Sequence, residues 1–179
     1  LGLALAVTSL PAAAETPANM LVIANRIDDI TTLEEGELLS PESLIQLPVD
    51  IDLPRFPKIQ PRADDPFLTR LNATDKTWAI LVGPDGEPRL ALNVSDFTRA
   101  ALYGPPPFSP YDHCHRPIVV RDRTTTLGEV IRRLKADADD IDEIIRNDVV
   151  LIWVDQPRII TGSDILGRLL IGIGDSAFG

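Results

Sequence analysis

The sequence predicts a mixed α/β fold in which two similar halves pack together as one unit. Two apolar segments, 78–82 and 149–154, are typical of strands that are buried on both faces. Each is followed by a turn, a second strand and a Ser-Asp pair that begins a helix, so each half has the order strand, helix, strand, strand, helix. Asp96 and Asp164, the acidic members of the two pairs, lie 68 residues apart. Two copies at so long a spacing indicate two pseudo-symmetric halves that share one buried face rather than a solenoid.

The composition is that of a globular domain, and it excludes several classes of function. Of the 179 residues, 44% are hydrophobic, which is enough for a core. The chain has 17 Lys and Arg against 27 Asp and Glu, and its formal net charge is −10. A protein that binds nucleic-acid phosphates, or anionic lipid by charge alone, needs a basic face instead. The single cysteine, Cys114, excludes an internal disulfide and a multi-cysteine zinc module.

The N-terminal segment, 1–39, begins with an apolar run for which three interpretations are open. The run is the last part of a transmembrane helix, the remnant of a signal peptide cleaved after Ala12-Ala13-Ala14, or a short packed helix. It is too short to cross a bilayer alone, which takes about 20 residues. The first residue is Leu1 rather than Met, so we expect a fragment or a processed product. Apolar positions within 17–39 recur at helical spacing.

Prolines define the next segment, 40–57, which is predicted to be an extended linker that crosses a surface. Six prolines fall between residues 40 and 66, and this density excludes a long helix or a central strand. The alternation of apolar and acidic residues over 49–53 predicts one short edge strand within the linker.

The first half is predicted to span 58–104. The elements assigned to residues in it are, in chain order, a short helix, two strands and a second helix: 67–72, 78–82, 89–94 and 95–102, and no range is assigned to its first strand. Pro66 suits the first position of the short helix, and Asp64 or Asp65 lies near its start. The two strands flank a Gly-Pro-Asp-Gly turn, and Ser95 offers an N-cap to the second helix.

A connector, 105–116, leads to the second half, 117–173, and a tail follows, 174–179. The elements predicted in the second half are a strand, a helix, two strands and a final helix: 117–120, 127–134, 149–154, 158–161 and 164–171. Thr126 and Glu129 have the spacing of a capping box at the start of the first of these helices.

The junction between the last strand and the last helix carries the residues best suited to bind a ligand. A helix N-terminus presents free N–H groups and a positive dipole end, which suits a phosphate. Thr161 and Ser163 add hydroxyl donors there, and the Asp164 carboxylate is able to accept hydrogen bonds from two ribose hydroxyls. These residues describe a nucleoside or nucleotide pocket. The alternative is that Ser163 and Asp164 only cap the helix. Recurrence of the pattern in the first half strengthens the pocket interpretation and leaves both alternatives open.

The same residues resemble the end of a cystathionine-β-synthase (CBS) repeat, two of which form a Bateman module. The family pattern is strand, turn, strand, Gly-hydrophobic-hydrophobic-Thr-x-x-Asp, helix. The second half matches it from Arg158 to Asp164, except that Arg158 stands where Gly is usual. The first half keeps Asp96 but has Leu90 and Asn93 in place of the usual Gly and Thr. The resemblance covers residues 58–173, roughly two thirds of the chain.

The resemblance implies an α+β fold of two β-α-β-β-α repeats packed as one Bateman module, with an N-terminal extension. Such modules bind AMP, ADP, ATP or S-adenosylmethionine. By position, Asp164 would hold the ribose and Thr161 the phosphate, while backbone groups of Ile118 and Val119 would line the base pocket. Arg158 would bind a phosphate or fill the space that the usual Gly leaves open.

A weaker second cleft is implied in the first half, formed by Asn93, Ser95 and Asp96. Because Asn93 replaces the usual Thr, we expect one occupied site rather than two.

The remaining clusters are expected to be structural. His113-Cys114-His115 offers two metal ligands at best, whereas a structural zinc takes four, and Cys114 lacks the partners of a catalytic nucleophile. The acidic stretch 137–143 lacks the spacing of a calcium loop and is expected to be a solvated helix face. No catalytic triad, P-loop or spaced carboxylate pair stands out, so we expect a protein that is not an enzyme and holds no cofactor or metal.

The expected function is therefore a regulatory module that senses an adenosine nucleotide. The apolar start favours an upstream transmembrane domain, a position on the cytosolic face of the membrane, and control of an attached transporter. A signal peptide would instead place the protein in a secreted or periplasmic compartment. The expected partner is a second copy of the chain, paired through the apolar faces of 97–102 and 165–171, and not nucleic acid. The alternative is a ligand-free dimerisation or interaction scaffold.

Overall fold

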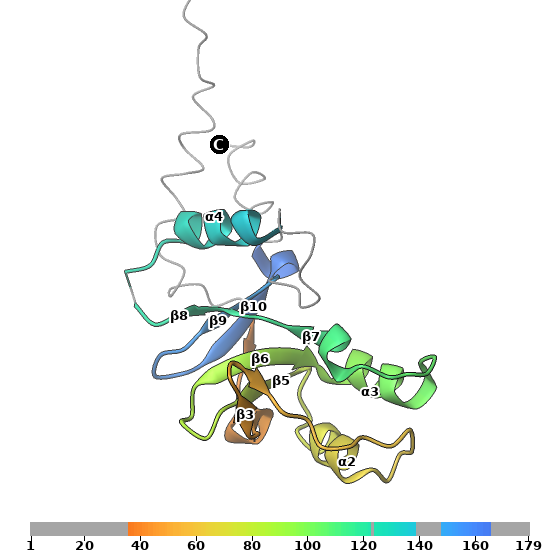
Figure 1. Ribbon diagram of the computed structural model, residues 1–179. Helices are drawn as coiled ribbons and strands as arrows, with labels where there is room; N and C mark the ends of the chain where they lie inside the picture. The colour runs from red at the N-terminus through yellow and green to blue at the C-terminus, as the bar shows by residue number, and fades with distance from the viewer. Residues whose placement is uncertain (1–35, 123, 139–147, 166–179) are drawn as a thin grey trace, which may run out of the picture.

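The computed structural model describes residues 36–122, 124–138 and 148–165. Within these ranges the chain has a mixed α/β fold with two four-stranded sheets and one small hairpin (Figure 1). The predictions for residues 1–35, for the acidic stretch after Ala138 and for the chain after Ile165 lie outside the described residues. Among the described residues, no helix combines the length and the apolar character that crossing a membrane requires.

The first sheet has the strand order β2-β5-β6-β7. Its strands are β2 (Leu44–Gln46), β5 (Trp78–Val82), β6 (Pro88–Asn93) and β7 (Cys114–His115). β2 runs parallel to β5, and helix α2 (Pro66–Asn72) lies between them in the chain, whereas β6 and β7 continue the sheet in antiparallel pairs. All five residues of β5 are buried, as the continuous apolar run predicts for a central strand.

The second sheet has the order β1-β10-β9-β8. Its strands are β1 (Glu37–Leu38), β8 (Ile118–Val120), β9 (Val149–Ile152) and β10 (Arg158–Thr161). β8 runs parallel to β9, with helix α4 (Leu127–Ala138) after β8 in the chain, and β10 and β1 follow in antiparallel pairs. The directions of successive strands therefore match those of the first sheet.

The short outer strands cross between the two halves. β1 precedes the first half in the chain, yet Glu37 pairs with Ile159 in the second sheet. β7 precedes the second half, yet His115 pairs with Ala91 in the first sheet. Each sheet is thus completed by the segment that leads into the other half, and the backbone hydrogen bonds of these crossing strands tie the halves together.

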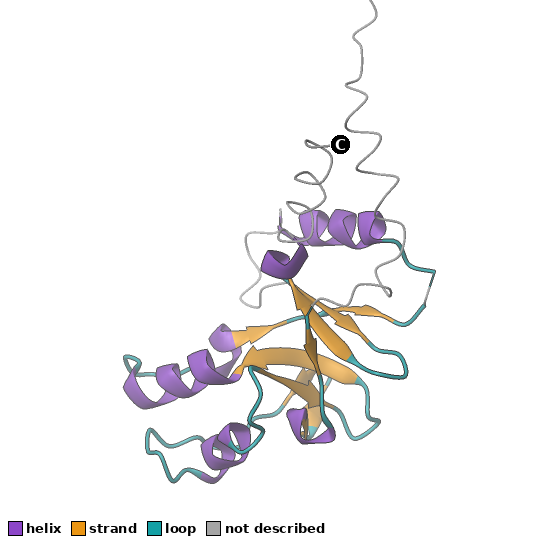
Figure 2. Cartoon of the chain, turned by 180° about the vertical axis from the view of Figure 1, so that it is seen from behind, coloured by secondary structure: helices purple, strands orange, loops and turns teal. Residues whose placement is uncertain are grey.

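The two sheets also pack face to face, with helices on their outer sides (Figures 1 and 2). Side chains alternate along a strand, so Trp78 and Ile80 of β5 meet Leu151 of β9 in the layer between the sheets. Helix α4 (Leu127–Ala138) covers the outer face of the second sheet, where Val130 packs with Val150 and its neighbours.

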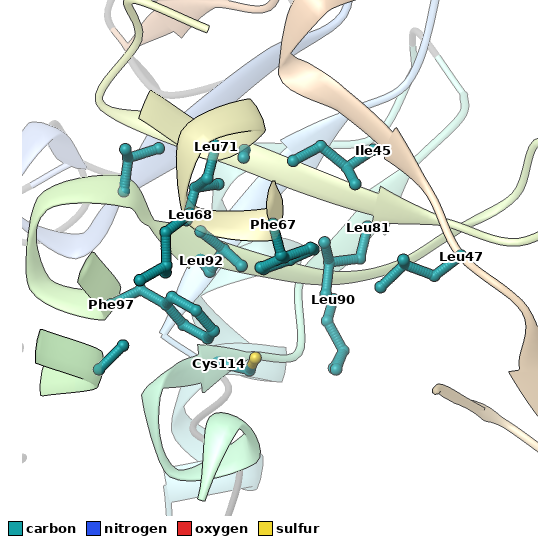
Figure 3. Close-up of a cluster of buried hydrophobic side chains, with 13 residues drawn as sticks. Ile45, Leu47, Phe67, Leu68, Leu71, Leu81, Leu90, Leu92, Phe97 and Cys114 are labelled. Carbon is teal, nitrogen blue, oxygen red and sulfur yellow. The ribbon is translucent and has the colours of Figure 1, made fainter. Parts of the chain in front are cut away.

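Helices α2 (Pro66–Asn72) and α3 (Val94–Tyr103) cover the outer face of the first sheet. Their buried side chains pack with those of the sheet in one core cluster, in which Phe67 and Leu68 of α2 meet Phe97 of α3 (Figure 3). The Asp65 carboxylate caps α2 by accepting hydrogen bonds from the backbone N–H groups of Phe67 and Leu68 at 2.9 and 3.1 Å.

The structure corrects the prediction of an extended linker over 40–57. Leu44–Gln46 is a strand of the first sheet, and Ile45 is fully buried. Pro41 and Pro48 lie just outside this strand, where their missing N–H groups remove no bond of the ladder. A 3-10 helix, η2 (Pro41–Ser43), precedes the strand. The prolines therefore bound the strand instead of excluding it.

The prediction of a single edge strand over 49–53 is wrong as well. The segment is a hairpin of β3 (Val49–Asp50) and β4 (Leu53–Pro54), closed by a turn in which Ile51 has a φ of 58°. Alternation of side chains matched the extended parts of this segment but did not reveal the reversal of the chain between them.

The apolar face of α3 is also placed differently from the expectation. Phe97 and Ala101 point into the protein's own core, with 0% and 5% of their surface exposed. This face is therefore not free to pair with a second copy of the chain. The side chain that caps α3 belongs to Asn93, whose Oδ1 accepts from the Asp96 N–H at 3.0 Å, and not to Ser95.

Candidate functional site

The residues singled out at the end of β10 form one hydrogen-bonded group. Asp164 Oδ2 accepts from the Thr161 N–H at 2.8 Å and from the Thr161 hydroxyl at 2.7 Å. The hydroxyls of Thr161 and Ser163 lie 2.7 Å apart. Residues 162–165 are helical, so these side chains surround a helix start, as the Thr-x-x-Asp spacing predicts.

This group borders a cavity of about 380 Å³, which we call the Asp164 cleft. Its lining residues come from three strands and their ends: Gly36, Glu37, Thr77, Trp78, Ile159, Thr161 and Asp164. The Thr77 N–H donates to Glu37 Oε1 at 3.1 Å, which ties the crossing strand β1 to the start of β5. The cleft therefore contains side chains from both halves of the chain.

Sequence reasoning found Thr161 and Asp164 but missed Glu37 and Trp78. The Glu37 position carries no local signal, because its place in the cleft depends on pairing with Ile159. Gly36 has a φ of +90°, and an added Cβ would lie 2.3 Å from the Ile159 carbonyl oxygen. Glycine is the residue that tolerates both conditions.

The other predicted residues of this site lie elsewhere. Arg158 is three residues before Thr161 on β10, and strand alternation places the two side chains on opposite faces of the sheet. Ile118 and Val119 belong to β8, which is separated from β10 by β9. Among the described residues, none of these three lines the Asp164 cleft. Ser163 reaches it only through its contact with Thr161.

A larger cavity of about 640 Å³, the Asp96 cleft, lies beside helix α3. One wall is a stripe of this helix and its cap: Asn93, Asp96, Arg99, Ala100, Tyr103 and Gly104. The other wall is the end of the 3-10 helix η3 (Pro110–His113) with β7: Asp112, His113, Cys114 and His115. Asn93 and Asp96 line the cleft as predicted, whereas Ser95 is exposed and does not.

The two clefts occupy matching places in the two sheets. Asn93 pairs with Trp78 at the start of β5, and Thr161 pairs with Val149 at the start of β9. The crossing strands contribute His115 to one cleft and Glu37 to the other. Trp78 connects them, since it lines the Asp164 cleft and its ring meets the His115 ring edge-on at 5.2 Å.

The two histidines are engaged with different partners. The His113 ring stacks on Phe108 at a centroid distance of 5.5 Å, and His115 Nδ1 is hydrogen-bonded to the Asp148 carboxylate. The described part of the chain holds no group of three or more side chains suited to a metal ion.

Cys114 lines the Asp96 cleft but is chemically protected. Burial, together with the nearby Asp112 carboxylate, raises the pKa of its thiol from 9.0 to about 12. The Sγ lies 3.3 Å from the Pro110 carbonyl oxygen, to which it donates. The thiol, not the nucleophilic thiolate, is therefore the form present at neutral pH.

We expect this thiol to make the protein less stable at alkaline pH. Between about pH 9 and pH 12 the unfolded chain releases the proton that the folded protein retains. The free energy of unfolding therefore falls as the pH rises, by roughly 1 kcal/mol at pH 10 from this group. Urea denaturation at pH 8, 9 and 10 measures the effect, with Cys114→Ala as the control that lacks it. Parallel pH dependences for the two proteins would contradict the prediction.

No model of a known protein family matches the chain, and no curated protein matches its sequence.

Proposed function

We propose that the chain is a regulatory pair of CBS repeats that binds an adenosine-type ligand in the Asp164 cleft and is not an enzyme. The ligand class comprises AMP, ADP, ATP and S-adenosylmethionine. The observation that carries the proposal is the Thr161–Asp164 group at a helix start, beside a cleft lined by both halves.

The strand order supports the two-repeat interpretation. Each sheet has a parallel pair across a helix, an antiparallel neighbour and a crossing strand from the other half. Two copies of one supersecondary unit, joined by exchanged strands and one apolar layer, account for this arrangement.

The position of the cleft supports a regulatory role. Trp78 belongs to the first half, whereas Thr161 and Asp164 belong to the second. A ligand held by all three therefore responds to the relative position of the halves. Such a ligand shifts the protein between two arrangements to the extent that it binds one of them more tightly. We propose that this shift acts on an attached membrane transporter, on the basis of the apolar composition of residues 1–7.

Calorimetric titration of the full chain with the four ligands tests the proposal. Residues 36 and 37 must be present, because they line the cleft. We expect saturable binding that Asp164→Ala weakens by about tenfold or more, since hydrogen bonds to a charged group are lost. Asp85→Ala, in an exposed turn away from the cleft, is the matched control and leaves the affinity unchanged. A folded protein that gives no heat with any of the four ligands would overturn the proposal.

One observation favours the second candidate, a ligand-free scaffold. Asp164 already accepts two hydrogen bonds from Thr161, so the helix start is capped without any ligand. A scaffold would keep its self-association in the Asp164→Ala variant. Sedimentation velocity, with and without the four ligands, distinguishes a ligand-dependent assembly from a constant one.

A further inference from the structure

We propose that the Asp164 cleft selects its ligand by charge and prefers a neutral or positively charged adenosine derivative to one that carries phosphate. The adenosine moiety rests on the proposed function. What goes beyond the proposed function is a preference for the charge of the group attached to that moiety.

The cleft carries two carboxylates and no cation among the described residues. Seven of these residues line it, and only Glu37 and Asp164 are charged. Glu37 accepts one hydrogen bond, from Thr77, through Oε1, and Asp164 accepts from Thr161 through Oδ2. Within the described residues the second oxygen of each carboxylate has no hydrogen-bond partner, so both remain available to a ligand.

Two nearby basic side chains, Arg158 and His115, do not line this cleft. Arg158 lies on the opposite face of β10 from Thr161 and does not line the cleft. His115 touches Trp78, but it lines the Asp96 cleft and is bound to Asp148. The Asp96 cleft, in contrast, includes Arg99 beside the carboxylates of Asp96 and Asp112. Of the two matching places, only the Asp96 cleft has an arginine among its described lining residues.

The consequence for a ligand follows from Coulomb's law in a partly buried site, where charges interact more strongly than in bulk water. A phosphate brings a further negative charge next to Glu37 and Asp164 and is repelled. A sulfonium group, as in S-adenosylmethionine, is attracted by the same two carboxylates. The ribose hydroxyls are neutral donors and still suit Asp164.

Quenching of Trp78 fluorescence tests the charge of the cleft without any nucleotide. In a Trp153→Phe background, Trp78 is the sole tryptophan, and it lines the cleft. The quenching constant of each ion is divided by that of acrylamide, which is neutral. We expect the resulting value for caesium to be about two- to threefold larger than that for iodide, because the local negative potential concentrates cations. In the converse variant, Trp78→Phe, the fluorescence comes from Trp153. Its quenching shows how much of the difference between caesium and iodide is due to the overall negative charge of the protein.

A matched pair of substitutions locates the effect. Glu37→Gln removes one charge but keeps an oxygen to accept from Thr77, and it is expected to reduce the difference between caesium and iodide by half or more. Glu87→Gln makes the same change in net charge at the opposite end of β5, since Glu87 precedes Pro88, which pairs with Val82. This control is expected to leave the difference between caesium and iodide unchanged. Equal quenching by both ions, or equal effects of the two substitutions, would overturn the proposal.

Ligand titration then tests the selectivity of the cleft between charged and neutral ligands. Only the part of the binding that Asp164→Ala abolishes is compared, because that part belongs to the Asp164 cleft. We expect S-adenosylmethionine to bind about fivefold or more tightly than AMP, and Glu37→Gln to narrow the ratio. Tighter binding of AMP than of adenosine in this component would overturn the charge selection while leaving the proposed function intact. If no adenosine compound binds, the proposed function fails, and the quenching experiment still decides the charge of the cleft.

Discussion

Replacement of Phe97 by alanine is expected to lower the free energy of unfolding by about 3–5 kcal/mol, the usual cost of removing a fully buried aromatic ring. Phe97 has no exposed surface and lies at the centre of a ring cluster. Its centroid is 5.8 Å from that of Phe56, 5.9 Å from Phe67 and 5.5 Å from Phe108. The alanine variant leaves a cavity between α2 and α3 that the three remaining rings cannot fill. Urea denaturation monitored by circular dichroism measures the loss.

Two further variants on α3 and in its core control this result. Tyr103→Ala removes a side chain from the same helix, but the residue is 81% exposed, and we expect a change below about 0.5 kcal/mol. Phe97→Leu retains much of the buried volume and should lie between the two. A Phe97→Ala variant no less stable than Tyr103→Ala would show that this cluster is not the core of the first half.

Replacement of Asp65 by alanine is expected to cost about 2–4 kcal/mol, because it leaves buried backbone donors without acceptors. The side chain is 3% exposed. Its Oδ1 accepts from the N–H groups of Phe67 and Leu68, and its Oδ2 accepts from the Gln60 N–H at 2.9 Å. One carboxylate therefore starts helix α2 and anchors the proline-rich segment that precedes it. Thermal and urea denaturation both measure the cost.

The two oxygens of Asp65 make the asparagine variant informative. Asp65→Asn keeps an acceptor for α2 but places an amide N–H₂ group against the Gln60 N–H, so we expect an intermediate loss. The neighbouring Asp64 is exposed and paired with Arg62, and Asp64→Ala should leave the denaturation midpoint unchanged. If the Asp64 and Asp65 variants behave alike, the carboxylate at 65 is not the cap that the hydrogen bonds indicate.

Local sequence patterns predicted the central elements of both halves. The apolar runs correspond to β5 and β9, and the segments that follow their turns correspond to β6 and β10. The predicted start of α4 is confirmed in part, since Thr126 Oγ1 accepts from the Glu129 N–H at 3.2 Å. The Glu129 side chain pairs with Arg133 instead of closing the capping box. These predictions succeeded because burial on both faces and helix capping depend on residues that are close in the chain.

The candidate site was predicted only where its residues are neighbours in sequence. Thr161 and Asp164 belong to one turn of chain, and their spacing alone indicates that they meet. Glu37 joins them because β1 pairs with β10, and Trp78 joins them because the two sheets pack face to face. No local periodicity indicates either arrangement. The resemblance assigns Arg158 to the same site because it stands where the family pattern has Gly, but the alternation of a strand turns its side chain to the other face.

The sequence by itself determined the mixed α/β class, the central strands and the residues at the two helix starts, because hydrophobic periodicity and capping are local properties. Tertiary structure alone decided that β1 and β7 exchange between the sheets and that the Asp164 cleft contains a second carboxylate. The physical reason is that each crossing strand has only two residues. Segments of two residues are too short to show a hydrophobic periodicity. The backbone hydrogen bonds at a sheet edge form with almost any side chain, so residue identity does not indicate the pairing either. Which strand each of them pairs with depends on which sheet edge remains unpaired once the two halves are packed together.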